Sequence, residues 1–566
     1  MRDNSNMLTK VLVLDAESAA GLETVQSLGR HGCTVDTASL RPEYSRHRSR
    51  FIRRDIELAA TKDDGIHELV ELFRDERYDL IVPTTEVALR VMLAPQIPDE
   101  LYERAVLAPK ASLETALNKE EVWNLAVRVG VRVPASQVVS AASSPPEAFP
   151  VVLKPVFSKR ETGGGVRDLH VTIARDLVQW RMALASEYRD IPVQQQQYVA
   201  GRGLGVEMLF ERGQPRWAFL HERIHELPLT GGGSSYRVSL GLRDDLVESA
   251  GLLLSALEWH GVAMVEFKVT SSGEAYLMEI NPRLWGSLAL AIDCGVNFPV
   301  GLLCLSRGKP LSSQPKYRVG YYARNIYRDV EWFKINLKSD HSDPLLLTRP
   351  VAASIVEWLR PLAGKESWDF FCWSDFGVIL GELGTLVREH WDRVILATRR
   401  RWQRMYLRYS QQPRVLRKLR ERKINAVLIL CHGNICRSPL AAALAARRFP
   451  MVSFSTAGFY SAVGRQSPDF VFATAGRLGI DLGSHRSKRV DSKMIDEAQL
   501  VLIMDIRNYE LLKSAFPHAL EKTLLLGMLL PKAQLEIGDP YDYPESMIAV
   551  ASKINDAIER LDRYFG

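Results

Sequence analysis

One segment of this 566-residue chain constrains its fold more than any other. The apolar run AVLIL at 426–430 leads directly into CHGNICR at 431–437, and SPLAAALAARRF follows. The first part is typical of a buried strand, and the last is typical of a helix with proline near its first turn. We therefore predict a strand-to-helix loop whose backbone amides gather at a helix N-terminus. Such a loop binds anions, because the helix dipole adds to the amides.

A cysteine and an arginine at the two ends of this loop indicate phosphate chemistry. The helix N-terminus stabilises the thiolate of Cys431, which can then attack at neutral pH. Arg437 offers a planar fork to two phosphoryl oxygens, and Ser438 can donate a hydrogen bond to the thiolate. The leaving oxygen needs a general acid. We assign this role to Asp539 in the turn-forming stretch DPYDY, where Asp542 is its rival.

From about 425 to 566 the sequence closely resembles the low-molecular-weight protein tyrosine phosphatases. The resemblance rests on CHGNICRSPLAAA, STAG at 455–458, GIDLGSHRSKRV at 479–490, VLIMD at 501–505 and DPYDYP at 539–544. It implies that Cys431 is the nucleophile, Arg437 the phosphate clamp, and Asp539 first the acid and then the base. It also implies that Asn434 and His485 support the loop. The remaining residues of the implied phosphate loop are His432, Gly433, Asn434, Ile435, Cys436 and Ser438.

Two positions of this loop leave questions open. His432 stands where the family usually has an apolar residue, which leaves substrate preference open. Cys436 either forms a protective disulfide with Cys431 under oxidation or fills the loop interior. A related arsenate-reducing branch requires further cysteines downstream, and none follows Cys436, so we do not expect arsenate reduction. The chain has six cysteines, too few for a disulfide framework at this length.

A second group of motifs, between 119 and 283, indicates nucleotide chemistry. Lys119 begins a predicted helix and Lys154 ends a predicted strand, each positioned to contact a phosphate. The glycines at 163–165 follow, and their amides can close over phosphates. The stretch VQQQQYVAG at 193–201 resembles a strand that runs into a hinge beside a nucleotide base.

Two further predicted strands, VEFK at 265–268 and MEINPR at 278–283, carry inward acids. Glu266, Glu279 and Asn281 put three oxygen ligands on neighbouring strands, and 279 and 281 share a face because side chains alternate. Oxygen ligands with few carboxylates suit Mg²⁺ held together with ATP phosphates. Arg283 is positioned to meet a substrate carboxylate or the transferred phosphoryl group.

Over about 8–320 these features resemble the ATP-grasp superfamily of carboxylate–amine (or thiol) ligases, most specifically through Glu-x-Asn-Pro-Arg. The family phosphorylates a carboxylate to an acyl phosphate, which an amine then attacks. The resemblance implies that Glu266, Glu279 and Asn281 hold Mg²⁺ (or Mn²⁺). It also implies that the loop HERIHELPLTGGGSS at 221–235 faces the substrate, with Arg223 binding the acyl phosphate. The implied ATP contacts are Lys119, Lys154, Gln197, Tyr198 and Val199.

Together the two resemblances predict an α/β multidomain protein, since this length exceeds one compact core. We expect a Rossmann-like pre-ATP-grasp domain with a parallel sheet at 1–110 and ATP-grasp α+β domains at 111–325. A helical region and basic linker would occupy 326–424, and we expect the tryptophans before the basic segment to be core residues, namely Trp332, Trp358, Trp368, Trp373 and Trp391. A phosphatase-like α/β domain with a parallel sheet would occupy 425–566.

The net charge of +6 is unevenly distributed. The segment 393–423 contains twelve Lys or Arg residues and a single acid, and the rest of the chain has a net negative charge. This segment is either a solvated linker helix or a surface for nucleic acid or an anionic membrane. The most apolar stretch, SLALAIDCGVNFPVGLLCL, contains Asp293, Asn297 and Pro299, so we expect no membrane span. The N-terminal residues lack a signal-like apolar run, and we expect a cytoplasmic protein.

We interpret the chain as a bifunctional enzyme. Its ligase would use ATP and Mg²⁺ to join a small-molecule carboxylate and an amine, and its phosphatase would act on a phosphomonoester in the same pathway. The alternative is a regulatory phosphatase that acts on phosphotyrosine in a separate protein, with the ATP-grasp part modifying another target. A third interpretation, an ATP sensor without catalysis, does not explain why the metal-binding acids and Arg283 are retained. We do not expect a nucleic-acid partner.

Overall fold

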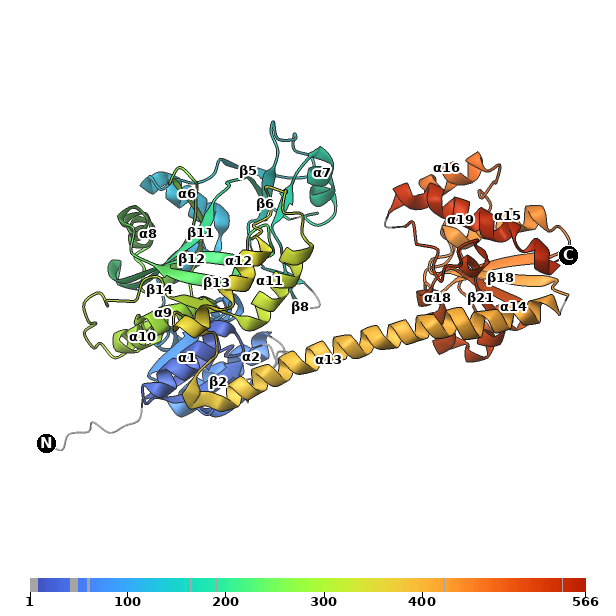
Figure 1. Ribbon diagram of the computed structural model, residues 1–566. Helices are drawn as coiled ribbons and strands as arrows, with labels where there is room; N and C mark the ends of the chain where they lie inside the picture. Colours follow the sequence, from blue (N-terminus) through green and yellow to red (C-terminus); the bar gives the residue numbers. More distant parts are fainter. Residues whose placement is uncertain are drawn as a thin grey trace. The chain divides into compact units, whose positions relative to one another are not determined.

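The computed structural model describes residues 9–40, 49–58, 62–157, 159–162, 165–189, 191–421, 423–541 and 543–565. The chain divides into two compact units, 1–387 and 388–566, which are described separately (Figure 1). The predicted α/β multidomain architecture is confirmed. The finer division into four parts remains a prediction.

The first unit begins with a parallel sheet in the order β3-β2-β1-β4, as the sequence indicates. Its strands are β1 (Lys10–Leu14), β2 (Thr34–Ser39), β3 (Ile52–Glu57) and β4 (Leu80–Pro83). Side chains of β1 alternate between two apolar clusters, so both faces of the sheet are buried. Its helices are α1 (Ala19–Arg30), α2 (Lys62–Glu76), α3 (Glu86–Met92), α4 (Asp99–Glu103) and α5 (Lys110–Leu117).

A small antiparallel sheet follows in the order β5-β10-β6-β9. It consists of β5 (Ser136–Val139), β6 (Val151–Pro155), β9 (Thr172–Ala174) and β10 (Val193–Gln197), with helices α6 (Lys119–Val129) and α7 (Leu177–Ala185). A hairpin of β7 (Lys159–Thr162) and β8 (Gly165–Asp168) lies between β6 and β9 in the chain. Gly163 and Gly164 of the predicted phosphate-closing loop lie outside the described residues.

A seven-stranded sheet in the order β15-β14-β11-β12-β13-β16-β17 holds the acidic motifs. The predicted substrate-facing loop at 221–235 is for the most part strand, because residues 221–227 pair with β13 and residues 221 and 222 also pair with β11. The strands are β11 (Arg202–Glu211), β12 (Gln214–Leu227), β13 (Gly233–Leu240), β14 (Gly261–Val269), β15 (Ala275–Asn281), β16 (Tyr322–Arg324) and β17 (Glu366–Trp368). The helices between them are α8 (Asp244–Ala256), α9 (Leu288–Cys294) and α10 (Phe298–Ser306).

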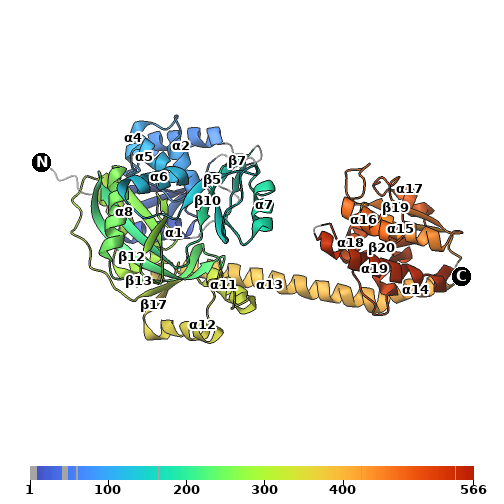
Figure 2. The same cartoon turned by 90° about the horizontal axis from the view of Figure 1, so that it is seen from above.

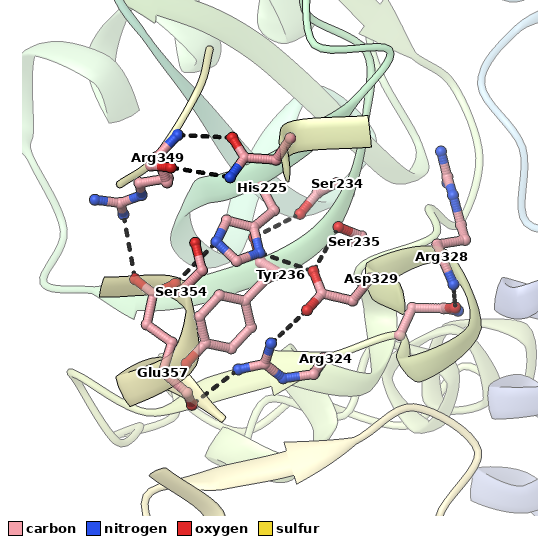
Figure 3. A network of polar contacts seen from close by, with 12 residues as sticks. His225, Ser234, Ser235, Tyr236, Arg324, Arg328, Asp329, Arg349, Ser354 and Glu357 are labelled. Carbon is pink, nitrogen blue, oxygen red and sulfur yellow. Dashed lines mark hydrogen bonds and ion pairs between the residues drawn. The ribbon is translucent and has the colours of Figure 1, made fainter. Parts of the chain in front are cut away.

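Helices α11 (Ile326–Lys338) and α12 (Val351–Glu357) are joined to this sheet by a buried polar network (Figure 3). The fully buried His225 lies 2.8 Å from Asp329 and 2.9 Å from Glu357, and its ring stacks on Trp332. The expectation that the tryptophans of this region are core residues is therefore right for Trp332. It is wrong for Trp373 and Trp391, which are 78% and 63% exposed.

The second unit is a four-stranded parallel sheet in the order β19-β18-β20-β21, as predicted. Side chains of β18 alternate between two apolar clusters, and helices cover both faces (Figures 1 and 2). The strands are β18 (Ala426–Cys431), β19 (Ser453–Gly458), β20 (Leu500–Ile503) and β21 (Thr523–Leu525). The helices are α15 (Arg437–Arg448), α16 (Asp469–Arg477), α17 (Ser492–Glu497), α18 (Ile506–Ala515), α19 (Met547–Glu559) and α20 (Asp562–Phe565).

The basic segment is helical, as predicted. Helix α13 (Phe376–Tyr406) spans the boundary between the two ranges, and a π-helical turn (Leu407–Gln411) joins it to α14 (Gln412–Arg420). In the described part of the chain, no single helix has both the length and the apolar composition to cross a membrane. The pair α9 and α10, bent by 86°, meets that test only when its two helices are taken together.

Candidate active sites

The sulfur of Cys431 lies at the end of β18, directly below the loop that leads into α15. The backbone N–H of Asn434 donates to Cys431 Sγ over 3.2 Å, and Ser438 Oγ lies 3.0 Å from the same sulfur. Cys431 is 2% exposed, so these contacts are made away from bulk water. The predicted strand-to-helix loop is therefore present, with polar donors gathered on its cysteine.

Asn434 holds the loop in shape from its centre. It adopts φ 53°, a left-handed conformation that asparagine tolerates better than most residues. Its side chain donates to Ser438 Oγ over 3.0 Å and accepts from the Lys488 backbone N–H over 2.8 Å. His485 Nε2 lies 2.8 Å from its carbonyl oxygen. Burial lowers the pKa of His485, which keeps the ring neutral and a donor to that carbonyl.

The loop also packs closely against β19. A Cβ on Gly458 would lie 2.7 Å from the carbonyl oxygen of His432 and 2.9 Å from the amide nitrogen of Asn434. Both are backbone atoms, which cannot move without moving the loop. Arg465 donates to the Gly433 carbonyl over 2.8 Å and so ties the other side of the loop.

Arg437 is almost completely buried beneath the loop and faces two carboxylates. Its Nη1 donates to Asp505 over 2.6 Å and to the Ile537 carbonyl over 2.9 Å, and its Nη2 donates to Asp539 over 2.5 Å. Its Nε is buried and has no hydrogen-bond partner among the described residues. The guanidinium is thus fixed in place with a donor left for an anion.

The structure brings together every phosphate-loop residue that the sequence indicates, together with Asp539. Asp542 lies outside the described residues. Sequence reasoning missed Asp505, whose segment was recognised but whose contact with Arg437 was not. Cys436 is buried beside the nucleophile, and burial, with the nearby Cys431, raises its pKa to about 12. Burial and Arg507 lower the pKa of His432, and its ring lies 5.9 Å from the Tyr460 ring at an interplanar angle of 60°.

The first unit contains a cavity of about 610 Å³ lined by the acidic motifs. Glu266 and Glu279 are direct partners in the pairing of β14 with β15, as predicted for neighbouring strands. The Asn281 side-chain nitrogen lies 2.9 Å from Glu266 Oε1 and 3.4 Å from Glu279 Oε1. The sequence-predicted residues that line this cavity are Lys119, Arg223, Glu266, Glu279, Asn281 and Arg283.

Positively charged side chains offset the negative charges of Glu266 and Glu279. Arg223 forms an ion pair with Glu266, and Lys154 Nζ lies 3.8 Å from Glu279 Oε2. Burial, opposed by Arg223, raises the pKa of Glu266. Burial also acts to raise the pKa of Glu279, but Lys154, Lys119 and Arg223 outweigh it and hold that pKa below its usual value. Burial and the charge of Lys154 lower the pKa of Lys119 to about 8.

The oxygen ligands around Asn281 suit a hard divalent cation. Two carboxylates and an amide converge from adjacent strands, which is the oxygen-rich, carboxylate-poor set that Mg²⁺ uses beside phosphates. Among the described residues, no group of three or more His, Cys, Asp or Glu side chains forms a metal site.

For other residues, the sequence prediction and the lining of the cavity differ. Gln197, Tyr198 and Val199 are not among the residues that line the cavity, although β10 pairs with the strand that carries Lys154. Conversely, Ser18, Thr84 and Thr85 of the first parallel sheet do line it and were not predicted. They follow β1 and β4, where the carboxyl ends of parallel strands form binding crevices.

A buried pair at the cavity wall was also missed. His221 Nδ1 lies 3.1 Å from Glu207 Oε1, and both side chains are buried. Burial, together with Arg223 and Arg237, holds the pKa of His221 well below its usual value, whereas burial raises that of Glu207. Both groups are thus favoured in their neutral forms.

Comparisons with known proteins agree with these two sites. The family described as "Low molecular weight phosphotyrosine protein phosphatase" matches residues 426–564, and the family "ATP-grasp in the biosynthetic pathway with Ter operon" matches residues 196–327. The low molecular weight protein-tyrosine-phosphatase Ptp of Acinetobacter johnsonii is 30% identical over 120 residues, which are 21% of this chain and 82% of the relative.

Two further proteins are similar to one part of the chain each. A protein-arginine-phosphatase of Geobacillus stearothermophilus is 32% identical over 137 residues, 24% of this chain and 92% of the relative. The crystal structure of an L-amino acid ligase from Bacillus licheniformis is 16% identical with a TM-score of 0.43, covering 54% of this chain and 76% of that one. The chain belongs, through residues 426–564, to the low molecular weight phosphotyrosine protein phosphatase family. The part that precedes this phosphatase domain matches an ATP-grasp family model over residues 196–327.

Proposed function

We propose that this chain is a bifunctional enzyme of one pathway: an ATP- and Mg²⁺-dependent carboxylate–amine ligase and a cysteine-dependent phosphomonoester phosphatase. The observation that carries the ligase is the cavity in which Arg223, Arg283 and Lys119 meet Glu266, Glu279 and Asn281. The observation that carries the phosphatase is the buried Cys431 with its donors and Arg437 beside it.

In the ligase, the side chains of Glu266, Glu279 and Asn281 hold the divalent cation. When bound, that cation neutralises charge on the phosphate oxygens of ATP. Lys119 and Lys154 contact the ATP phosphates, and the chain around Gln197, Tyr198 and Val199 binds the base. The substrate carboxylate attacks the γ-phosphorus and ADP leaves. Arg223 and Arg283 stabilise the acyl phosphate, from which an amine then displaces phosphate.

In the phosphatase, the Cys431 thiolate attacks phosphorus while the phosphate oxygens accept from the loop amides and from Arg437. The bond to the ester oxygen breaks, and Asp539 gives that oxygen its proton. Asp539 then takes a proton from the water that attacks the phosphocysteine, so that phosphate leaves and the thiolate is restored. Ser438 donates to the thiolate at both stages.

The ligase proposal is tested by measuring ADP release from the full chain against pairs of amino acids and other carboxylates and amines. We expect release that requires Mg²⁺ or Mn²⁺ and both co-substrates, and a new amide in the products. Glu279→Gln keeps the size of the side chain but removes a charged ligand, and it should abolish release. Arg243→Gln, a partly exposed position of the same unit, is the control and should not abolish release. A product without ADP, or activity that persists in Glu279→Gln, contradicts the proposal.

A second candidate for the phosphatase is phosphotyrosine in a separate protein. It is favoured by the names of relatives such as Ptp of Acinetobacter johnsonii, a protein-tyrosine-phosphatase. The discriminating measurement compares kcat/KM for phosphotyrosine peptides with that for phosphorylated forms of the ligase's own substrate and product. A preference for the small molecules supports the single pathway, and a preference for peptides supports the regulatory role.

A further inference from the structure

An exposed aromatic patch lies on the C-terminal end of α13 and the turn that follows it. We call Trp391, Trp402, Met405, Tyr406 and Tyr409 the aromatic stripe. Trp402 follows Trp391 by three helical turns, and Met405 and Tyr406 follow Trp402 by about one, so these side chains share a face. Each member is exposed, from 44% for Met405 to 71% for Tyr409. Exposed aromatic groups of this size on one face indicate a binding surface.

The opposite face of the same helix is already used within the phosphatase unit. Leu407 is fully buried in a core cluster with Leu428 and Leu430 of β18. Gln403 hydrogen-bonds Glu510, and Gln411 donates to the Leu520 carbonyl over 2.8 Å. Burial of that side fixes the rotation of the helix. The aromatic stripe is therefore held outward by packing behind it.

Arginines flank the stripe on both sides. Between 393 and 409 the sequence has six arginines and no acid. Taking 100° per residue, Arg399 lies about 60° to one side of Trp402 and Arg401 about 100° to the other. Among the described residues, Arg399, Arg400 and Arg401 have no carboxylate partner. Their charge is thus available to an anionic partner.

A groove of about 450 Å³ continues this surface. It lies between the end of α13 and the loop at 533–536, and Arg401, Arg404 and Arg408 line it together with Met405 and Tyr409. The only acid that lines it is Glu536, which pairs with Arg404 over 3.1 Å. Three arginines beside an aromatic ring suit a phosphate headgroup rather than an apolar segment.

We propose that residues 391–409 bind the surface of an anionic lipid bilayer. The aromatic stripe enters the interfacial layer, where tryptophan and tyrosine are favoured, and the arginines contact headgroup phosphates. Self-association through the stripe is disfavoured, because two copies would bring Arg399 and Arg401 against like charges. The two tryptophans and two tyrosines lie on one face, which matches a planar interface better than a nucleic-acid groove.

The test is sedimentation of the full chain with large vesicles of phosphatidylcholine, with and without phosphatidylglycerol. We expect binding only where phosphatidylglycerol is present, and weaker binding as salt is raised. The double variant Arg399→Glu/Arg401→Glu should weaken binding at least about tenfold, and Trp402→Ala should weaken it as well. The matched controls are Arg477→Glu and Met451→Ala, which change an exposed charge and an exposed apolar side chain elsewhere on the same unit.

Phosphatase activity on p-nitrophenyl phosphate without vesicles should be the same in all these variants, which shows that each is folded. Absence of vesicle binding by the wild-type chain overturns the proposal. So does an equal loss in Arg477→Glu and the double variant. A dimer that Trp402→Ala dissociates, or a duplex DNA oligonucleotide that binds more tightly than the vesicles, would likewise assign the surface to another partner.

Discussion

Two carboxylates hold the same guanidinium in the phosphatase site, yet their surroundings differ. Asp505 accepts from Arg437 and also from the backbone N–H of Asn508, as the N-cap of α18. Asp539 accepts from the other nitrogen of Arg437 and is 39% exposed at its side chain. An exposed carboxyl at the mouth can reach a leaving group, whereas one that caps a helix is held in place. This contrast allows the acid to be tested against a matched neighbour.

We predict that Asp539→Asn slows phosphoenzyme formation least for p-nitrophenyl phosphate and progressively more as the pKa of the leaving group rises. A nitrophenolate departs readily as an anion, whereas an alkoxide does not. General acid catalysis is worth about 10²–10⁴-fold, so the slope is measurable. The assay is a series of aryl phosphates under single-turnover conditions. The phosphocysteine should also accumulate, since the same residue serves as base.

The matched control for this series is Asp505→Asn, which removes the other charge from Arg437 and retains a good N-cap. It should lower the rates about equally for all leaving groups. A flat loss at Asp539 with a steep dependence in Asp542→Asn would transfer the role of acid to Asp542.

A second prediction at this scale concerns Gly458. Gly458→Ala places a methyl group against the backbone of His432 and Asn434, so the phosphate loop must shift. A displacement of about 1 Å at a reacting group costs about 10²-fold, and we expect a loss of this order in kcat/KM. Gly476→Ala in α16 is the control, because its added Cβ would meet no atom within 4 Å beyond its chain neighbours and the nearby backbone of its own helix. Equal activity of the two variants would show that the loop tolerates movement.

The sequence predicted residues that are close along the chain, that alternate on one strand, or that a family motif marks, as DPYDYP marks Asp539. Cys431 to Ser438 belong to one turn, and Glu279 and Asn281 share a strand face by simple alternation. Asp505, Ser18 and Thr84 reach their sites only when separate strands are brought side by side, and no spacing along the chain encodes that. The exposure of Trp391 was missed for the same reason. The sequence alone does not show whether an aromatic residue on a helix is buried or exposed, because it does not show which face of the helix packs against the protein.

At the scale of elements, β16 binds the helices that follow the ATP-grasp region to its sheet. Arg324 of this strand is fully buried and donates to Glu366 of β17 over 2.7 Å and to the Glu357 carbonyl of α12 over 3.0 Å. It also forms an ion pair with Asp329 of α11, and its guanidinium lies over the Tyr236 ring (Figure 3). One side chain thus joins four elements and ties 326–375 to the seven-stranded sheet of the first unit.

We predict that Arg324→Met lowers the free energy of unfolding of the first unit by about 3–5 kcal/mol, because it leaves buried Asp329 and Glu366 without their cation. Arg243→Ala, which breaks an exposed pair with Asp245, should cost about 0–1 kcal/mol. Denaturant unfolding followed by tryptophan fluorescence reports mainly on this unit, since nine of the eleven tryptophans precede residue 388. A small loss of stability in Arg324→Met would mean that the polar network rearranges around the site of the missing guanidinium.

At the scale of the whole molecule, the two candidate sites belong to two separately packed units. The acidic cavity is lined only by residues of 1–387, and the thiol loop with its supports lies entirely within 388–566. No catalytic assignment in either site needs a residue of the other unit. Effects of changes at distant, unshared positions are nearly additive. The coupling of the two activities, if one pathway links them, therefore lies in the substrates that they share.

The last prediction is that the two activities are separable by single changes. Glu279→Ala removes a charged ligand from the cavity and should abolish ATP turnover, while hydrolysis of p-nitrophenyl phosphate by the same sample stays within about twofold of wild type. Cys431→Ser removes the nucleophile and should do the opposite. Both sites are assayed in each purified variant, with thermal unfolding to show that both units remain folded. Loss of both activities in a folded variant would mean that one site depends on the other, and would contradict two independent centres.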